Sequence, residues 1–399
     1  MTEDAAAGSA RQSEGLRIFL VAAEESGDRL GGSLMRALRK RSSMPIQFFG
    51  VGGHAMQAEG LASLFPIGDF AIIGFSAIPR RVPAILRHLH ATVRAAIAMP
   101  PHGMVVIDSP EFSLRVARRV RAKNPAIPIV NYVSPSVWAW RPWRARSMRD
   151  YIDHVLALLP FEPAVHARLG GPPCSFVGHP LTERVDELRP NADEARRRNA
   201  SPPVLLVMPG SRRGEIKRML AIFAEAVAAV AGRAGALEIV VPTVPHLYDE
   251  VKQAVAMWQV PSQVVVDPAQ KNAAFRNARA ALVKSGTGTL ELAIAGVPMV
   301  AAYKVSRFEE FIARLMIKTP SVILANLVLG DNVVPEFLQK ECTPPRLAEA
   351  LLQLLNDTPQ WRSQSEAFRR LDAIMEIGKA VPSDRAAEIV LDFACRGRQ

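Results

Sequence analysis

Residues 281–291 read ALVKSGTGTLE, a short apolar run that passes through a glycine-containing loop into a helical pattern. An apolar run of this length, placed directly before a loop and a helix, is typical of a buried strand in a parallel sheet. The loop has neither the Gly-Lys-Ser/Thr ending of a Walker loop nor the spacing of a dinucleotide fingerprint. Either it is an ordinary helix start with glycines for packing, or its small residues and backbone amides bind a diphosphate.

The same order of strand, loop and helix recurs along the chain. Further strand-like runs lie at 16–22, 104–107, 127–133, 204–208 and 237–241, each followed by a loop and a helical pattern. Strands and helices that alternate at these lengths indicate parallel sheets covered on both faces. The sequence therefore predicts an α/β fold of two Rossmann-like domains with a cleft between them and a helical C-terminal tail.

A Ser-Pro-Pro run at 201–203 follows a charged stretch and marks the predicted boundary between the two domains. A chain of 399 residues is too long for one hydrophobic core and suits two domains. We expect a disordered tail at 1–15, an N-terminal domain at 16–200 and a C-terminal domain at 201–365. The helices of 366–399 should pack back on the N-terminal domain or on a partner subunit.

The composition, 49% hydrophobic and 22% charged, is that of a globular protein. No apolar run approaches the ~18 residues that a membrane-spanning helix needs, and the polar first residues do not resemble a signal peptide. The three cysteines show neither zinc spacing nor a disulfide framework, which favours a reducing compartment. We therefore expect a cytoplasmic protein.

Positive charge is concentrated in one segment. Residues 80–149 hold thirteen Lys or Arg and two acids, and the resulting net charge equals the +11 of the whole chain. Either these residues are solvated helix faces, or the segment attracts an anionic partner such as a phospholipid surface or a phosphorylated substrate. Motifs of nucleic-acid binding are missing from the segment, so we expect no nucleic-acid partner.

Within this basic segment, an apolar run at 70–75 precedes a helix that carries both an apolar stripe and arginines. The stripe consists of Val82, Ile85, Leu86, Leu89, Val93 and Ile97, and the arginines are Arg80, Arg81, Arg87 and Arg94. Most amphipathic helices pack on their own domain. The dense arginines favour the alternative, in which the helix lies against anionic lipid.

A second strand-to-helix turn, at 209–215, reads PGSRRGE. Arg212 can donate paired hydrogen bonds to phosphate oxygens, and with the helix terminus it would stabilise the charge of a departing nucleoside diphosphate. The alternative is a capped helix with surface charge. The candidate diphosphate-binding residues of the two turns are Gly210, Ser211, Arg212, Ser285, Gly286, Thr287, Gly288, Thr289 and Glu291. Glu291 could accept hydrogen bonds from ribose hydroxyls or could complete a capping box.

Asp108 is the candidate catalytic residue of the first domain, because it stands where the run 104–107 ends. A partly desolvated carboxylate suits a general base that takes a proton from an acceptor hydroxyl, and a helix cap is the alternative. Trp138 lies in a strand-end loop, where sites are often built, although tryptophans more often belong to a core. His179 either contacts ligand or packs near the domain junction. The other histidines show no ligand spacing, so we expect no metal.

Six motifs occur in a fixed order along the chain. They are AEESGD at 23–28, GVGG at 50–53, SPSVWAW at 134–140, FVGHP at 176–180, PGSR at 209–212 and SGTGTLE at 285–291. Each motif is weak alone, but the ordered set and the SPSVW run are specific. From about residue 16 onward, the chain resembles the lipid-A-disaccharide synthase family.

The resemblance implies an inverting GT-B-type glycosyltransferase of lipid A biosynthesis that needs no cofactor and no metal. The donor would be UDP-2,3-diacylglucosamine and the acceptor 2,3-diacylglucosamine 1-phosphate, joined by a β-1,6 link with release of UDP. Asp108 and Arg212 would be catalytic. The residues expected on the acceptor side or in the cleft are Ser26, Asp28, Ser136, Trp138, His179 and Asn326. The family also implies a homodimer, bound peripherally to the inner face of the cytoplasmic membrane.

Two other functions are compatible with these residues, because a fold does not fix a function. A UDP-GlcNAc 2-epimerase on the same fold would convert soluble UDP-GlcNAc without an acceptor. A non-catalytic nucleotide-binding protein at a membrane surface would bind UDP but release none from a donor.

Overall fold

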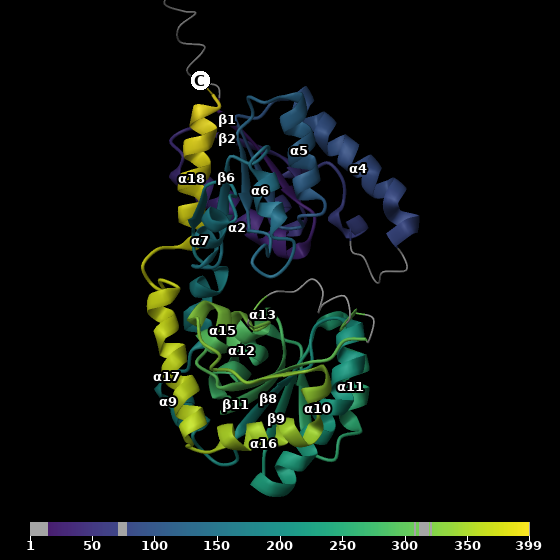
Figure 1. Cartoon of the computed structure of the whole chain (residues 1–399), viewed down its shortest axis with the longest axis vertical. Coiled ribbons are helices and arrows are strands. Elements are labelled where there is room, and N and C mark those ends of the chain that lie inside the picture. The colour runs from purple at the N-terminus through teal and green to yellow at the C-terminus, as the bar shows by residue number, and fades with distance from the viewer. Residues whose placement is uncertain (1–14, 71–77, 307–308, 311–318, 320, 399) are drawn as a thin grey trace, which may run out of the picture. The chain divides into compact units, whose positions relative to one another are not determined.

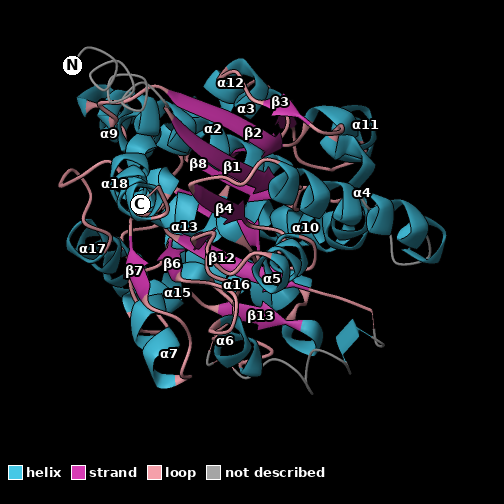
Figure 2. Cartoon of the chain, turned by 90° about the horizontal axis from the view of Figure 1, so that it is seen from above, coloured by secondary structure: helices cyan, strands magenta, loops and turns pink. Residues whose placement is uncertain are grey.

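The computed structural model describes residues 15–70, 78–306, 309–310, 319 and 321–398 (Figure 1). Unit 1 comprises Met1–Pro180 and Ala380–Gln399, and unit 2 comprises Leu181–Lys379. Each unit is built on its own parallel sheet, and helices surround the strands (Figure 2). This architecture confirms the predicted fold class. The predicted tail at 1–15 falls, except for its last residue, outside the described residues.

The sheet of unit 1 has seven parallel strands in the order β3-β2-β1-β4-β5-β6-β7. The strands are β1 (Leu16–Ala22), β2 (Ile46–Val51), β3 (Ala62–Ser63), β4 (Gly103–Ile107), β5 (Ile129–Tyr132), β6 (His154–Ala157) and β7 (Cys174–Phe176). The helices are α2 (Glu25–Arg41), α3 (His54–Ala58), the 3₁₀ helix η1 (Ile67–Phe70), α4 (Ile78–Ala98), α5 (Ser113–Lys123), α6 (Trp143–Met148), α7 (Glu162–Arg168) and α18 (Pro382–Arg396).

Strand β1 shows why the central strands are apolar almost throughout. Ile18 and Leu20 face the layer of α2 and α18, whereas Phe19 and Val21 face the layer of α4 and α5. A parallel strand covered on both faces has no side that water reaches, so its apolar residues need not alternate with polar ones. The structure therefore confirms the buried strand that the sequence predicts at 16–22, with the same bounds.

The last helix, α18, returns to the first sheet and supplies part of the core of unit 1. Ala386, Val390 and Ala394 are fully buried beside α2 and β4. These small side chains let the helix lie close to the strand, because a Cβ added at Gly103 would stand 3.2 Å from that of Ala394. Unit 1 is therefore built from two segments that are far apart in the sequence.

Unit 2 has six parallel strands in the order β10-β9-β8-β11-β12-β13. The strands are β8 (Val204–Met208), β9 (Glu238–Pro242), β10 (Ser262–Val265), β11 (Ala280–Lys284), β12 (Met299–Tyr303) and β13 (Glu336–Leu338). The helices are α8 (Val185–Leu188), α9 (Ala192–Arg198), α10 (Arg213–Ala234), α11 (Tyr248–Ala256), α12 (Pro268–Asn277), α13 (Thr287–Ile294), α15 (Leu324–Leu329), α16 (Pro344–Leu355) and α17 (Pro359–Ile374), with 3₁₀ helices η3 (Pro180–Arg184), η4 (Pro245–Leu247) and η5 (Gln339–Glu341).

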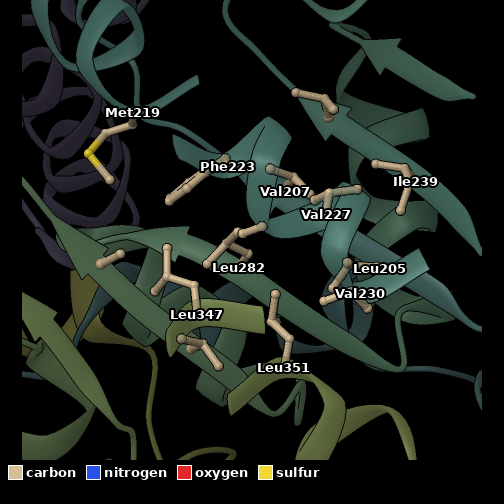
Figure 3. Packing of buried hydrophobic residues seen from close by; sticks show 14 of the residues in the cluster. Leu205, Val207, Met219, Phe223, Val227, Val230, Ile239, Leu282, Leu347 and Leu351 are labelled. Atoms are coloured by element: carbon tan, nitrogen blue, oxygen red, sulfur yellow. The ribbon is translucent and has the colours of Figure 1, made fainter. Parts of the chain in front are cut away.

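One face of the second sheet is covered by α10, α11 and α16. Figure 3 shows Phe223 and Val227 of α10 and Leu347 of α16 packed over Val207 and Leu282 of the strands. This layer fixes the start of α10 relative to the end of β8. The chain between these two elements is one of the two turns singled out in the sequence.

The bounds of the two units differ from the predicted domain bounds. Unit 2 begins at Leu181 rather than at 201, because the short helices before β8 are tied to it. Arg198, at the end of α9, donates four hydrogen bonds of 2.9–3.0 Å to carbonyls at the end of α12 and just after α13. Within the predicted tail 366–399, only α18 belongs to unit 1, whereas α17 packs on α13 and α15 of unit 2.

Two helix bounds differ from those that the sequence pattern predicts. Helical spacing covers 29–40, but the helix begins at Glu25, so the turn residues before it form its first turn. Helical spacing also runs through 353–377, but that stretch is divided between α16 and α17. The Thr358 hydroxyl accepts a hydrogen bond from the Trp361 amide, and Pro359 opens α17, which together start a new helix.

Helix α4 carries the stripe for which the sequence left two interpretations open. Leu89 and Val93 are buried in the core of unit 1, whereas Val82 and Leu86 are 42% and 41% exposed. The second half of the helix thus packs on its own unit, and its first half presents apolar side chains outward. Residues 71–77 and the side chains of Arg80 and Arg81 fall outside the described residues. Among the described helices, none is long and apolar enough to cross a membrane.

Candidate active site

A pocket of about 410 Å³ lies at the carboxyl ends of β8, β9 and β11 in unit 2. Its lining comprises Met208, Gly210, Ser211, Arg212, Glu215, Pro242, Thr243, Val244, Lys271, Val283, Lys284, Ser285, Gly286, Thr287, Gly288 and Glu291. Both strand-to-helix turns singled out in the sequence therefore line the same pocket. Ligands of parallel α/β sheets bind at this edge.

The turn between β11 and α13 presents a helix start to the pocket. Gly286 is the residue before the helix and has a φ of 154°, which side chains rarely tolerate. Because a glycine stands there, the first amides of α13 receive no side-chain cap. Thr287 is exposed beside them. Backbone amides in this arrangement, together with the helix dipole, favour an anion.

The turn between β8 and α10 brings a second helix start to the pocket. Gly210 has a φ of 119°, and a Cβ added there would lie 2.6 Å from a carboxylate oxygen of Glu215. Arg212 stands just before α10, with its side chain 82% exposed and Nη1 3.3 Å from Glu215 Oε1. The guanidinium is thus held at one nitrogen while most of it is accessible to a ligand.

Glu215 and Lys284 form a buried ion pair in this pocket that sequence analysis did not assign. Lys284 Nζ lies 2.9 Å from Glu215 Oε1, and the Ser211 amide donates to Oε2 at 3.4 Å. Burial raises the pKa of the Glu215 carboxyl, but the hydrogen bond and charge of Lys284 outweigh burial, and the pKa is lowered overall. The signal for this ion pair in the sequence was Lys284 itself, a charged residue at the end of an otherwise apolar strand.

Glu291 is held by Lys271, which the sequence also did not single out. Lys271 Nζ lies 3.1 Å from both carboxylate oxygens. The residue before α13 is Gly286, which has no side chain to exchange hydrogen bonds, so the capping-box alternative for Glu291 is wrong. A carboxylate with a fixed orientation at the pocket wall remains available as an acceptor for ligand hydroxyls.

Three of the predicted site residues, two expected at the diphosphate and one on the acceptor side or in the cleft, use their polar groups within the protein. The Thr289 hydroxyl donates to the Gly286 carbonyl at 2.7 Å, is fully buried and does not line the pocket. The Ser285 hydroxyl donates to the Val322 carbonyl at 3.0 Å. The buried Asn326 amide donates to the carbonyl of Val334 and accepts from its N–H, both at 2.9 Å. In this structure Ser285 and Thr289 hold the loop at the start of α13, and Asn326 holds the segment that leads to β13.

In unit 1, Asp108 stands at the carboxyl end of β4 in a conformation that few side chains adopt. Asp108 and Ser109 have φ values of 52° and 45°, in the left-handed region, which costs energy for residues other than glycine. The Ser113 hydroxyl donates to the Asp108 carbonyl, and the Asp108 amide donates to the Tyr132 carbonyl at 3.0 Å. Two consecutive strained residues at a strand end are typical of a functional site.

The Asp108 carboxylate faces Ser26 from the start of α2. The Ser26 hydroxyl donates to Asp108 Oδ2 at 2.8 Å, which joins the ends of β1 and β4. Phe112, and not Asp108, is the residue before α5, and it makes no side-chain cap. The alternative of a helix cap for Asp108 therefore fails, and its carboxylate is positioned by another polar side chain.

Asp28 was expected on the acceptor side, but its carboxylate has a structural role within unit 1. Its carboxylate is buried and accepts from the backbone amides of Gly53, Ala55 and Met56 at 2.7–3.1 Å. These amides belong to the GVGG turn and to the start of α3. Asp28 thus explains why the first two sequence motifs occur together: one supplies the carboxylate and the other the amides that it caps.

The SPSVWAW loop follows β5 and is fixed by two residues of α7. Trp138 Nε1 donates to Glu162 Oε1 at 3.3 Å, and the Ser134 hydroxyl lies 2.9 Å from His166 Nε2. Between these two attachments, Ser136 is exposed. Sequence analysis missed Glu162 and His166, since nothing in their local pattern indicates which loop they contact.

Burial changes the ionisation of the histidines and the carboxyl in this part of unit 1. It raises the pKa of Glu162 to about 7, against the opposing hydrogen bonds from Leu159 and Trp138, and lowers the pKa of His166 to about 4. Burial also lowers the pKa of His179, after β7, to about 4. Both imidazoles are therefore neutral at pH 7, and neither supplies a cation to a phosphorylated ligand.

The stability of Glu162→Gln relative to wild type should increase as the pH rises. The pKa of Glu162 rises from its ordinary 4.5 to about 7 on folding, so between these values the folded protein binds more protons than the unfolded chain. Its contribution to stability therefore falls through this window, by roughly 3 kcal/mol in all, and glutamine does not titrate.

Urea unfolding of both proteins at pH 5, 6, 7 and 8 measures this difference. His166 contributes to the free energy of unfolding in the opposite direction, because its contribution increases with pH between about 4 and 6.5. It is present in both proteins and therefore cancels in the difference between them. A difference between the two proteins that stays constant with pH would show that Glu162 is ionised throughout.

Within the described ranges, no group of three or more His, Cys, Asp or Glu side chains could hold a metal ion. The polar groups at the strand ends are instead cations, helix amides and single carboxylates. In unit 2 they suit a diphosphate, and in unit 1 they suit proton transfer to Asp108.

Comparisons with known proteins agree with this geometry. A family model described as lipid-A-disaccharide synthetase matches residues 18–390. A protein from Nitrobacter hamburgensis, described as lipid-A-disaccharide synthase, is 58% identical over 399 residues that cover all of both chains.

Solved structures share the fold at low sequence identity. A calicheamicin glycosyltransferase superposes with a TM-score of 0.61 at 18% identity, covering 96% of this chain and 99% of its own. A UDP-N-acetylglucosamine 2-epimerase superposes with a TM-score of 0.61 at 10% identity, covering 97% and 98%. The fold is thus shared by transferases and epimerases, and the family assignment rests on the match of the whole sequence. The chain therefore belongs to the lipid-A-disaccharide synthetase family of glycosyltransferases.

Proposed function

We propose that this glycosyltransferase moves 2,3-diacylglucosamine from its UDP donor to 2,3-diacylglucosamine 1-phosphate, with inversion, in lipid A biosynthesis. Family membership supports the reaction. The observation that carries the donor assignment is the pocket of unit 2, where two helix starts and the Arg212 guanidinium converge. This is the arrangement that a nucleoside diphosphate requires.

Unit 2 stabilises the leaving group in this proposal. As the bond between the sugar C1 and the diphosphate oxygen breaks, UDP gains negative charge. Arg212 and the amides at the starts of α10 and α13 are fixed before the reaction and stabilise that charge as it develops. The two hydrogen bonds that Lys271 donates to Glu291 hold a carboxylate that accepts from the ribose hydroxyls.

Unit 1 activates the acceptor. Asp108 takes the proton of the acceptor 6-hydroxyl, whose oxygen attacks C1 of the donor and forms the β-1,6 link. Ser26 donates to Oδ2 and orients the carboxylate, so we assign Oδ1 as the atom that accepts the proton. The loop with Ser136 and Trp138, and His179 after β7, stand at the same edge of the sheet as Asp108 and contact the acceptor.

The substrates are acylated, and the protein therefore works at a lipid surface in this proposal. It binds peripherally to the inner face of the cytoplasmic membrane, as a homodimer. The concentration of positive charge in residues 80–149 and the exposed Val82 and Leu86 of α4 support membrane binding. Co-sedimentation with anionic vesicles at low salt tests it, and an unchanged supernatant would refute it. Light scattering in detergent tests the dimer, and a monomer mass would refute it.

The reaction is tested by UDP release in detergent micelles. The purified chain is incubated with UDP-2,3-diacylglucosamine, with and without 2,3-diacylglucosamine 1-phosphate. We expect UDP only when the acceptor is present, together with a disaccharide 1-phosphate. A parallel incubation with UDP-GlcNAc alone tests the epimerase, which would convert it without an acceptor. UDP binding without release from any donor would instead indicate a non-catalytic protein.

A further inference from the structure

Lys284 is the residue of the nucleotide pocket whose charge the proposed function does not use. It ends β11 and immediately precedes the loop that opens α13. A Cβ built at Gly286 would lie 3.5 Å from Lys284 Nζ, so the ammonium stands over the start of that helix. A cation beside a helix N-terminus gains nothing from the helix dipole and is favourable there only with an anion nearby.

The ammonium is held in place on two sides. Nζ lies 2.9 Å from Glu215 Oε1 and 4.5 Å from the centre of the Tyr303 ring, and the side chain is only 13% exposed. A lysine normally loses much side-chain entropy when it binds a ligand. Here the side chain is already ordered in the folded protein, so ligand binding removes little further entropy from it. The remaining N–H groups of the ammonium keep fixed directions.

The charges that line the pocket do not balance. Three cations, Arg212, Lys271 and Lys284, stand against the two carboxylates Glu215 and Glu291. Lys271 is matched with Glu291 by two contacts of 3.1 Å. Arg212 and Lys284 share a single oxygen, Oε1 of Glu215. The excess positive charge therefore lies where these two cations meet, beside two helix starts.

We propose that Lys284 is a second diphosphate-binding residue, which contacts the terminal phosphate of UDP together with Arg212. The inference rests on the proposed function, because it takes a nucleoside diphosphate as the ligand of this pocket. The shared Glu215 oxygen places Lys284 beside the arginine to which the leaving charge is assigned. Lys284 then distinguishes a diphosphate from a monophosphate, whereas the Lys271–Glu291 pair meets the part that both nucleotides share.

The test is calorimetric titration of the full chain with UDP and with UMP. Wild type should bind UDP more tightly than UMP, and Lys284→Met should reduce this preference by about 10- to 100-fold while affecting UMP far less. Lys271→Met removes the same charge from the same pocket and is the matched control. It should weaken both nucleotides alike and leave their ratio unchanged.

A second variant controls for a disrupted fold, because methionine at 284 leaves the buried Glu215 carboxylate without its lysine partner. Lys284→Met combined with Glu215→Gln removes both charges and keeps the net charge of the pocket, and it should show the same loss of preference. If both Lys284 variants keep the wild-type preference, Lys284 serves only to pair with Glu215, and the proposed function stands. If wild type itself binds no UDP, both proposals fail.

Discussion

Asp108→Asn should lower kcat for disaccharide formation by about 10²- to 10⁴-fold and leave the affinity for UDP close to that of wild type. Asparagine has nearly the same shape and tolerates the left-handed backbone conformation at this position. It can still accept the Ser26 hydroxyl, but it cannot take the proton of the acceptor hydroxyl. The loss should therefore appear in turnover and not in nucleotide binding.

Single-turnover kinetics with saturating acceptor, together with UDP titration, measure the two quantities. Asp150→Asn, at an exposed carboxylate of the same unit, is the control for a lost negative charge and should keep turnover near wild type. Near-normal turnover in Asp108→Asn would remove Asp108 as the base, and its strained conformation would then need another explanation.

Arg212→Ala should lower kcat by about 10²- to 10³-fold and weaken UDP binding by roughly tenfold or more. Both effects arise because the guanidinium contacts oxygens that are charged in bound UDP and gain further charge as the bond breaks. Arg212→Lys should recover only part of each, since an ammonium cannot make the paired hydrogen bonds of the planar group.

The neighbouring Arg213 offers a matched control. It is also exposed, and it pairs with Glu250 at 2.9 Å rather than with a residue of the pocket. Arg213→Ala removes the same charge one residue away and should change neither UDP affinity nor kcat appreciably. Equal effects of the two alanine variants would show that only the overall charge at the start of α10 matters.

The central strands and the loops that follow them could be predicted because their signals are local. The apolar runs 16–22 and 204–208 coincide with β1 and β8, since a strand covered on both faces must be apolar wherever it lies in the sheet. Glycine and hydroxyl residues after a strand likewise mark a turn. Parallel topology then brings such turns to one edge, as the shared pocket of unit 2 shows.

Side-chain partners could not be predicted, because they come from distant segments. Asp28 and Asp108 are both carboxylates near strand ends, yet one caps a helix that begins 26 residues later and the other stands in a strained turn beside Ser26. Thr289 differs from Thr287 only in facing inward. The pairing of Lys284 with Glu215 joins two motifs that were each interpreted separately.

The domain bounds differed for the same reason. A proline-rich run at 201–203 has the composition of a linker, but Arg198, just before it, is bound to the ends of two helices of unit 2. A half-buried arginine that caps helix ends leaves no pattern in its own neighbourhood. Only the three-dimensional contacts show that the short helices before β8 belong to the second unit.

The return of α18 to the first sheet sets an order for folding during synthesis. Unit 2 is one continuous stretch of chain, whereas the core of unit 1 lacks Ala386, Val390 and Ala394 until the last helix has left the ribosome. Nascent chains usually fold from the N-terminus onward, domain by domain. Here unit 2 can fold first, while the sheet of unit 1 keeps part of an apolar face exposed until α18 is available. Chaperones bind nascent proteins in such a state.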